Sequence, residues 1–269
     1  MFTKADIFEQ LQRMNAPRDS AVHVHTSLRL IGNIEGGGEG LLDILIEYFT
    51  ADGGLLVVPT HTWGNLGKDK ITLDLTEPWS NLGVFSMIAA NDSRAVRSEN
   101  PTHSVAVFGD REKALKYVEN ESTVKTPTSP DSVYGKLFYE KGYVLLLGVD
   151  QSKNTYLHAV AEILGLPDRM DDKPVPVTVK KLDGEVIKRD LVLYDCSYTE
   201  DISWRFPKYE TAFRYTGAIV DGFVGNAPAQ LCDAVKMKET VELILKNSNG
   251  KDPLCGEGAI PPKWYCTKE

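Results

Sequence analysis

Short apolar strands that alternate with helical segments constrain this chain more than any other feature of its sequence. LLVVP at residues 55–59 is apolar throughout, and YVLLLG at residues 143–148 has the same character. A helix-like apolar pattern at residues 41–49 lies between LLVVP and an earlier strand, AVHVH at residues 21–25. Strand, helix and buried strand in this order predict a βαβ unit, and hence a parallel sheet with a covered face. The expected fold class is therefore α/β.

The alternation of strands and helices extends through the first two thirds of the chain. At its start, Thr3 and Asp6 have the spacing of a capping box at the beginning of an amphipathic helix. Further on, a strand is expected at residues 104–109 and helices at residues 111–120 and 155–164.

The pattern changes after the last of these helices. Two alternating runs flank an Asp-Gly pair at residues 183–184, which is a strong β-hairpin signal. A strand is expected at residues 217–225, followed by a helix from Pro228 to about Lys246. We therefore expect residues 1–269 to form a single α/β domain. Its central sheet would be mixed and largely parallel, flanked by helices, with the β-hairpin as an extension.

The charge balance narrows the class of partner. The formal net charge is −8, which argues against nucleic acid or an anionic membrane as the main partner, because both select basic surfaces. It is compatible with a small cationic amine as substrate. The N-terminal segment carries charges where a signal peptide has an apolar run, and no stretch approaches the ~20 apolar residues of a membrane span. The expected location is the cytoplasm.

Four segments lie at or just beyond the expected carboxyl ends of strands, where α/β proteins place their chemistry. They are HTSLRLIG (residues 25–32), PTHTWG (59–64), ENPTHSVAVFG (99–109) and GVDQSKNTYLHAVAE (148–162). With TPTSPDSVYGKL (126–137) between the last two, they resemble in content and order the aminoglycoside 3-N-acetyltransferase family, also called antibiotic N-acetyltransferases. The similarity runs from about Val22 to Met170, with a fainter match at residues 225–239.

This resemblance implies both a fold and an activity. The fold would be the family's own and not that of the GCN5-related acetyltransferases. The nearest match to that superfamily's phosphate loop runs from Arg29 through Gly32 to Ile34. Its last, branched side chain would keep a pyrophosphate away from the backbone amides. The implied activity is transfer of acetyl from acetyl-CoA to the 3-amine of a 2-deoxystreptamine aminoglycoside, without a covalent intermediate or a metal.

The family's Asn-Thr-x-x-His segment matches NTYLH here, so the resemblance implies that His158 is catalytic. A histidine near pKa 6.5 can take a proton from the acceptor amine at neutral pH, which an attacking ammonium must lose. Glu162 lies four residues later, on the same helical face, and is the candidate that would orient the imidazole. The family pattern has its glutamate three residues after the histidine, where this chain has Ala161.

The resemblance also implies residues that face the pantetheine arm and phosphates of CoA. The HTSL turn would supply one wall and the start of SVAV the opposite wall, and the candidate residues are His25, Thr26, Ser27, Leu28, Ser104 and Val105. Small hydroxyl residues after a strand suit an anion-accepting turn. Thr60 and Thr62 are candidates to steady the oxyanion of the tetrahedral intermediate, and His103 is either a site residue or a packed neighbour.

Other residues are candidates for contacts with the acceptor. Acidic side chains after the hairpin would pair with ammonium groups, and the candidates are Asp195, Glu200 and Asp201. Tryptophans that either line a sugar cleft or pack in the core are Trp63, Trp79 and Trp204.

Alternative functions remain open from sequence alone. Within the acetyltransferase class, the acceptor could be another amine. A metal-dependent amidohydrolase barrel would use His23 and His25 with His61, His103, His158 and Asp150 as ligands. The chain has too few βα units for eight, and the hairpin breaks the alternation. The third alternative is a non-enzymatic module that binds a drug without turnover.

Overall fold

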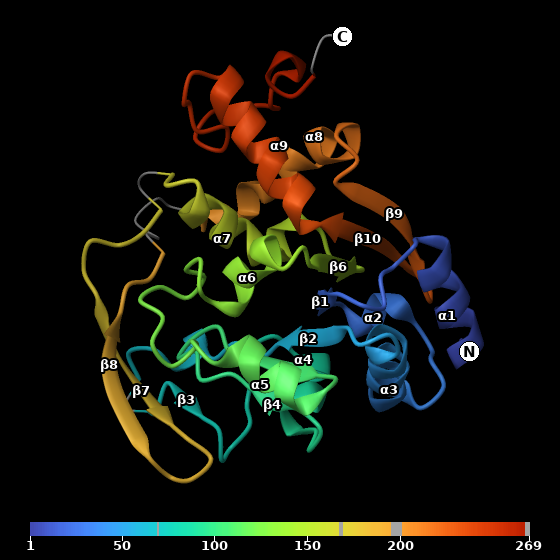
Figure 1. The fold of residues 1–269 in the computed structure, drawn as a ribbon, viewed down its shortest axis with the longest axis vertical. Coiled ribbons are helices and arrows are strands. Elements are labelled where there is room, and N and C mark those ends of the chain that lie inside the picture. Colours follow the sequence, from blue (N-terminus) through green and yellow to red (C-terminus); the bar gives the residue numbers. More distant parts are fainter. Residues whose placement is uncertain (69, 167–168, 195–200, 267–269) are drawn as a thin grey trace.

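The computed structural model describes the chain except for residues 69, 167–168, 195–200 and 267–269. Its centre is a seven-stranded sheet with the order β4-β5-β2-β1-β6-β10-β9 (Figure 1). A smaller sheet with the order β3-β7-β8 lies beside it. The strands are β1 (Ala21–Thr26), β2 (Leu55–Pro59), β3 (Leu73–Asp74), β4 (Val96–Arg97), β5 (Val105–Phe108), β6 (Tyr143–Leu147), β7 (Val175–Lys180), β8 (Val186–Leu191), β9 (Ile219–Val224) and β10 (Ala227–Asp233).

Helices cover both faces of the large sheet. The α-helices are α1 (Lys4–Arg13), α2 (Leu28–Ile31), α3 (Gly37–Thr50), α4 (Val84–Asn91), α5 (Arg111–Val118), α6 (Val133–Tyr139), α7 (Tyr156–Ile163), α8 (Glu210–Tyr215) and α9 (Ala234–Asn247). The 3-10 helices are η1 (Trp63–Asn65), η2 (Gln151–Lys153), η3 (Ile202–Tyr209) and η4 (Pro262–Trp264). Among these described helices, none is both long enough and apolar enough to cross a membrane.

Two buried clusters, one on each face of the sheet, form the core. On one face, Val22 and Val24 of β1 pack with apolar residues of α1, α3 and α4. On the other face, Leu55 and Val57 of β2 pack with residues of α5, α6, α7, α8 and α9. The predicted helices and buried strands in the first two thirds of the chain are confirmed, including the capping box that Thr3 makes with Asp6.

Within the described part of the large sheet, parallel pairing is confined to the three central strands, so this sheet is mixed but less parallel than expected. β1 pairs in parallel with β2 and with β6, whereas β5 runs antiparallel to β2 and β10 runs antiparallel to both β6 and β9. An apolar run predicts that a strand is buried, but its direction depends on how the preceding connection returns to the sheet. β5 directly follows the short strand β4, with which it also pairs antiparallel.

The prediction of a helix beginning at Pro228 is wrong. Pro228 lies in β10 and is paired with Phe223 of β9. Its ring removes a backbone donor but leaves the carbonyl, which accepts from the amide of Gly148 at 2.8 Å. The helix begins instead at Ala234, where the Asp233 side chain accepts from the Lys236 amide as its N-cap.

The predicted β-hairpin is confirmed. β7 and β8 are antiparallel, with Lys180 opposite Val186, and Gly184 has a φ of 89° in the turn. The short strand β3 pairs with β7 and completes the smaller sheet. In Figure 1 this hairpin extends from the body of the molecule on the side away from α1.

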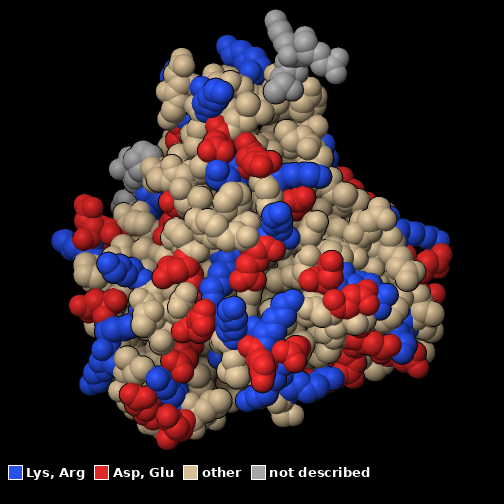
Figure 2. All heavy atoms as spheres, in the orientation of Figure 1, with Lys and Arg blue, Asp and Glu red and all other residues tan. Residues whose placement is uncertain are grey.

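Acidic and basic side chains are interspersed on the face shown in Figure 2. The net charge of −8 is therefore not gathered there into one acidic field. On this face, attraction for a cation depends on individual acidic side chains and not on one extended acidic patch.

Gly148, directly after β6, offers a test of how tightly this sheet edge is built. Its φ is 65°, and an added Cβ would lie 2.8 Å from Leu30 Cβ. Gly165 has a φ of 62° with nothing within 4 Å of an added Cβ. Gly165→Ala should therefore cost only the left-handed backbone term of about 1–2 kcal/mol, and Gly148→Ala clearly more. Urea denaturation of both variants measures the difference. Equal decreases in the free energy of unfolding of the two variants would show that α2 shifts to accommodate the added methyl group at little cost.

Candidate active site

Four of the five sequence motifs meet at one edge of the large sheet. The parallel strands β1, β2 and β6 all end there. The amide of Ser27 donates to the Leu147 carbonyl at 2.8 Å, which joins the HTSL turn to the end of β6. The amide of Thr60 donates to the Ser104 carbonyl at 2.8 Å, which joins the segment after β2 to the segment before β5. ENPTHS precedes its strand and reaches the same edge because β5 is antiparallel to β2.

All five histidines of the chain gather on the side of the sheet that faces α5–α9. His23 and His25 alternate with Val22 and Val24, as the strand pattern predicts. His61 packs against His103 with ring centroids 4.4 Å apart. Burial is the main cause that lowers the pKa of each histidine: to about 4 for His25 and His158, to about 3 for His103, and well below 6.5 for the other two. These imidazoles are therefore neutral at pH 7.

His158 lies in the first turns of α7 and is half-buried. Its ring is stacked on Tyr194, with centroids 4.0 Å apart and planes at 20°. Phe206 of η3 meets it edge-on, with a centroid distance of 4.9 Å. After burial, the charged groups that act on its pKa are Asp201, which raises it, and Arg169, which lowers it. A neutral, fixed imidazole has the protonation state that a general base requires.

Glu162 lies one turn after His158 on α7, but its carboxylate turns toward two threonines. Thr126 and Thr128 each donate a hydroxyl to it, at 2.5 Å. Burial raises the pKa of Glu162, and the two threonine hydrogen bonds lower it. The structure thus places an acid at the predicted position without turning it to the imidazole. The role of Glu162 stays a prediction.

The turn predicted to face CoA carries two buried polar atoms without a hydrogen-bond partner among the described residues. Within the part of the chain that the structure describes, His25 Nε2 and Thr26 Oγ1 are buried and have no hydrogen-bond partner. Ser27 is the N-cap residue of α2 without a side-chain cap bond. The side chain of Leu28 packs against the buried cluster beneath. A buried polar atom without a partner is costly. Both atoms are inaccessible in this structure, so contact with a ligand requires a local rearrangement of the turn.

The side chains predicted to form the opposite wall of the CoA groove are buried inside the protein. Ser104 and Val105 are fully buried. Ser104 Oγ donates to the Thr60 carbonyl at 2.9 Å, and Arg97 donates to Ser104 Oγ at 3.3 Å. These two residues reach the same sheet edge as His25 but point into the protein. The hydroxyl groups proposed for the oxyanion are also engaged, because Thr60 Oγ1 lies 2.9 Å from Ser104 Oγ and Thr62 Oγ1 donates to Pro101.

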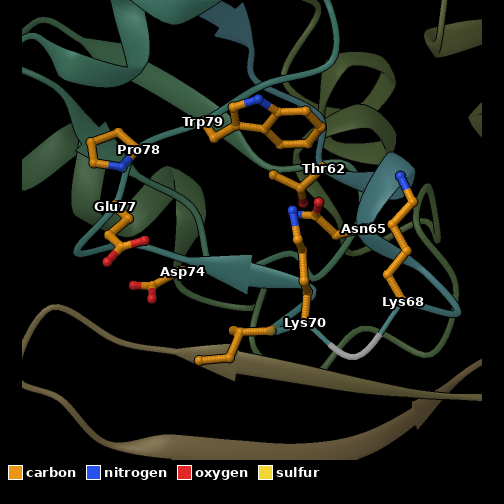
Figure 3. Close-up of a pocket in the computed structure, with 9 residues that line it drawn as sticks. Thr62, Asn65, Lys68, Lys70, Asp74, Glu77, Pro78 and Trp79 are labelled. Atoms are coloured by element: carbon orange, nitrogen blue, oxygen red, sulfur yellow. The ribbon is translucent and has the colours of Figure 1, made fainter.

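Two pockets open beside this edge. One has a volume of about 760 Å³ and lies beside α2, η2 and β10, lined among others by Leu30, Gly148, Lys153 and Trp204. The other has a volume of about 630 Å³ and lies between η1 and β3. Figure 3 shows the side chains that line it: Thr62, Asn65, Lys68, Lys70, Asp74, Glu77, Pro78 and Trp79.

The structure places the remaining candidates in different surroundings. Asp201 acts electrostatically on His158, whereas Asp195 and Glu200 lie outside the described residues. Trp79 and Trp204 each line one of the two pockets, and Trp63 is half-exposed, at 47%.

Sequence reasoning missed the tyrosines that support the histidines. Tyr134 Oη lies 2.6 Å from His61 Nε2, and Tyr117 Oη lies 3.0 Å from His23 Nε2. Tyr134 lies in the TPTSPDSVYGKL motif. This motif contributed to the family resemblance, but no function was predicted for any of its residues. Tyr194 comes from the end of the hairpin region, where nothing in the local sequence indicates a site residue.

Metal ligation by the histidines is the geometry that the amidohydrolase alternative requires. Among the described residues, no group of three or more His, Cys, Asp or Glu side chains is arranged to hold a metal ion. The open seven-stranded mixed sheet also contradicts an eight-stranded parallel barrel.

The fold and the site combine a mixed α/β sheet with a cluster of neutral histidines near the carboxyl ends of its parallel strands. Two pockets open beside these strand ends, and His158 lines neither of the two. The sequence profile of the family described as Aminoglycoside 3-N-acetyltransferase matches residues 23–246. The chain therefore belongs to this family, and its enzyme class is that of an acyltransferase that acts on amines. The expected fold of this family, distinct from that of the GCN5-related enzymes, is confirmed.

Relatives of this chain match nearly its whole length. The SPbeta prophage-derived aminoglycoside N(3')-acetyltransferase-like protein YokD of Bacillus subtilis (strain 168) is 23% identical over 93% of this chain and 94% of its own length. Aminoglycoside N(3)-acetyltransferase IV of Salmonella sp is 26% identical over 93% and 88%. Among solved structures, AAC-IIIb in binary complex with CoASH has a TM-score of 0.77 at 20% identity, covering 91% of this chain and 97% of its own. The AAC(3)-IVa apoenzyme has a TM-score of 0.73 at 25% identity, covering 94% and 90%.

The histidine cluster predicts that the protein loses stability in mild acid. The folded pKa values lie below 6.5, so between about pH 6.5 and 4 the unfolded chain binds protons that the folded chain excludes. Stability is present above pH 6.5 and falls by about 1.4 kcal/mol per pH unit for each such proton. Buried Glu121 opposes this by one proton, because its pKa is raised to about 7.

The measurement is urea denaturation at pH 7, 6 and 5, with His103→Gln as the comparison. This variant removes one titrating group and should flatten the dependence by about one proton. A midpoint that stays constant from pH 7 to pH 5 would contradict the buried, neutral state of the cluster.

Proposed function

We propose that this protein transfers the acetyl group of acetyl-CoA to the 3-amine of a 2-deoxystreptamine aminoglycoside, with His158 as general base. The observation that carries the proposal is the neutral imidazole of His158, which interacts electrostatically with His61 and His103 from two other motifs of the family. Use of acetyl-CoA is consistent with a cytoplasmic enzyme, because that metabolite is made inside the cell.

The chemistry needs little beyond positioning and proton transfer. The acceptor amine attacks the thioester carbonyl, the C–N bond forms, and the nitrogen loses its proton to the imidazole of His158. The tetrahedral intermediate collapses with cleavage of the C–S bond, and the CoA thiolate leaves and takes up a proton. The thiolate is a good leaving group, so no covalent intermediate with the protein and no Lewis acid is required.

The larger pocket is proposed to hold CoA. Its lining includes Leu30, from the HTSLRLIG motif that begins at His25, and Gly148, the first residue of the GVDQSKNTYLHAVAE motif. Lys153 lies 4.4 Å above the ring of Trp204, so a cation and an exposed aromatic face stand together at its rim. Such a pair suits a phosphate and an adenine ring. The unpartnered Nε2 of His25 and Oγ1 of Thr26 lie at the end of β1. Neither residue lines this pocket, and both are proposed to contact the pantetheine arm once the turn adjusts to the ligand.

The smaller pocket is proposed to hold the acceptor. Glu77 offers a carboxylate for an ammonium group, and Trp79 offers a flat face for a sugar ring. Asp74 also lines this pocket, but its carboxylate is paired with Lys180 at 3.0 Å. Asp201, near His158, is proposed as a further partner of an ammonium. Solved relatives are described as complexes with a gentamicin, with apramycin and with sisomicin. Another amine acceptor remains the alternative within the same class.

The first test is release of free CoA from acetyl-CoA in the presence of a panel of amines. A 2-deoxystreptamine aminoglycoside should accelerate thiol release, and NMR of the product should place the acetyl group on the 3-amine. The same assay with a chelator should show undiminished activity. Acceleration by other amines alone would replace the aminoglycoside, and activity lost on chelation but restored by zinc would revive the hydrolase.

The second test separates the base from the CoA turn. His158→Ala should lower kcat by ~10²–10⁴-fold while acetyl-CoA affinity changes little, since general-base help has that typical size. His25→Ala should weaken acetyl-CoA binding as well, because His25 is proposed to contact the cofactor. Calorimetry and thiol release on both variants give the comparison. Near-wild-type kcat in His158→Ala would remove the base assignment.

A further inference from the structure

Tyr194 connects His158 to Glu162 through one threonine. Its ring is stacked on the imidazole of His158, and its hydroxyl lies 2.6 Å from Thr128 Oγ1, which in turn donates to Glu162 Oε1. We propose that Tyr194 is a positioning residue for the general base His158. Glu162 fixes the position of Tyr194 through the hydroxyl of Thr128. This inference rests on the proposed function, because it assigns the support of the same base.

The stacking fixes the plane of the imidazole. The ring of Tyr194 stacks on one face of the imidazole, with centroids 4.0 Å apart and planes at 20°. The ring of Phe206 also packs against the imidazole, with an interplanar angle of 71°. Tyr194 is itself braced by the edge of His103, with centroids 5.7 Å apart and planes at 87°. With aromatic neighbours at these angles, the ring of His158 has little freedom to rotate, so its basic nitrogen keeps one direction.

The direction of the hydrogen bonds follows from the number of protons. A threonine hydroxyl has one hydrogen to donate. When Glu162 is ionised it can only accept, so Thr128 gives its hydrogen to Glu162 Oε1 and the phenol of Tyr194 is the donor at Thr128 Oγ1. Burial raises the pKa of Tyr194 well above 10, so the phenol keeps this proton at neutral pH. Thr126 holds the other oxygen, Glu162 Oε2, at 2.5 Å.

This arrangement gives Glu162 a role without contact to the imidazole. When Glu162 is ionised, its charge polarises the chain of two hydroxyls and makes the phenol ring a richer π-donor. During turnover His158 becomes an imidazolium, and a cation stacked on an electron-rich ring is stabilised. The glutamate stands four residues after His158, with Ala161 at the third position. Although Glu162 is one position further from His158 than in the family pattern, it reaches the imidazole indirectly, through Thr128 and Tyr194.

Other charged or titratable groups also act on His158 and stay constant in the test. Asp201 precedes η3, and Arg169 follows α7. The neutral imidazoles of His61, after β2, and His103, before β5, also interact with His158. The variants proposed below leave all four in place. A change in the pH profile can therefore be assigned to the Tyr194 link.

The experiment compares Tyr194→Phe, Tyr194→Leu and Thr128→Val, with Tyr139→Leu as the matched control at an exposed tyrosine of α6. Tyr194→Leu should lower kcat roughly tenfold, with the KM for acetyl-CoA within about twofold of wild type. Tyr194→Phe keeps the ring and should lose less. The double variant of Tyr194→Phe and Thr128→Val should lose no more than the larger single loss, because either change breaks the same link.

A second readout does not depend on turnover. In NMR spectra the Hε1 signal of His158 should carry a ring-current shift from Tyr194, lost in Tyr194→Leu and kept in Tyr194→Phe. The acid limb of the kcat profile should move to lower pH in Thr128→Val, because the imidazolium loses stabilisation, and stay in place in Tyr139→Leu. If Tyr194→Leu does not fold, the Phe and Val variants still decide.

Three results would overturn the inference: an unchanged His158 signal in Tyr194→Leu, an unchanged kcat in that variant, or additive losses in the double variant. Failure of the proposed function looks different. No amine would then accept acetyl, or His158→Ala would keep its kcat, while the His158 signal would still report on the stacking.

Discussion

The parallel pairing of β1 with β2 and β6 is the constraint on which the rest of the structure depends. Three adjacent strands that run in one direction must end at one edge, and each connection must return over a face of the sheet. The helices of these connections bury Val22, Val24, Leu55 and Val57 on the two faces. The same geometry brings the segments after the three strands together, so the core and the site have one origin.

Burial and reactivity are linked at this edge. The helix layer that covers the sheet also covers the histidines, and this desolvation keeps their imidazoles neutral. Neutrality suits a general base at His158, whereas for His23 and His61 it creates a cost in acid. Tyrosine hydroxyls beside these two buried rings supply the hydrogen bonds that the interior requires. Function and acid sensitivity therefore follow from the same packing.

The division of the site between two pockets follows from the sheet order. The pocket with Leu30 and Gly148 lies toward β6 and β10, and the pocket with Thr62 and Asp74 lies toward β2 and β3. Under the proposed function, the donor and the acceptor approach the edge from opposite sides. The β-hairpin contributes β7, which pairs with β3 at the second pocket, so an element outside the large sheet helps to shape this pocket.

Local patterns in the sequence determined the α/β class, most strands and helices, the β-hairpin and the family. Thr3 and Asp6 capped α1 as expected, because a capping box needs only residues three positions apart. The helix predicted to begin at Pro228 was wrong. Proline is compatible with the first turn of a helix, and also with a strand position where no backbone amide is needed as a hydrogen-bond donor. The NTYLH motif singled out His158, since its signal is also local.

Tertiary structure alone decided strand direction and the partners of the site residues. Ser104 and Val105 have the right place in a motif, but packing on both faces of the sheet buries them completely, and the Ser104 hydroxyl bonds to the Thr60 carbonyl. Glu162 has the spacing of an orienting acid, yet two threonines from a distant loop take its carboxylate. Tyr194 reaches His158 from 36 positions along the chain, and only the path of the chain beyond β8 brings the two rings together. Such contacts depend on how elements pack, and no pattern of neighbouring residues encodes them.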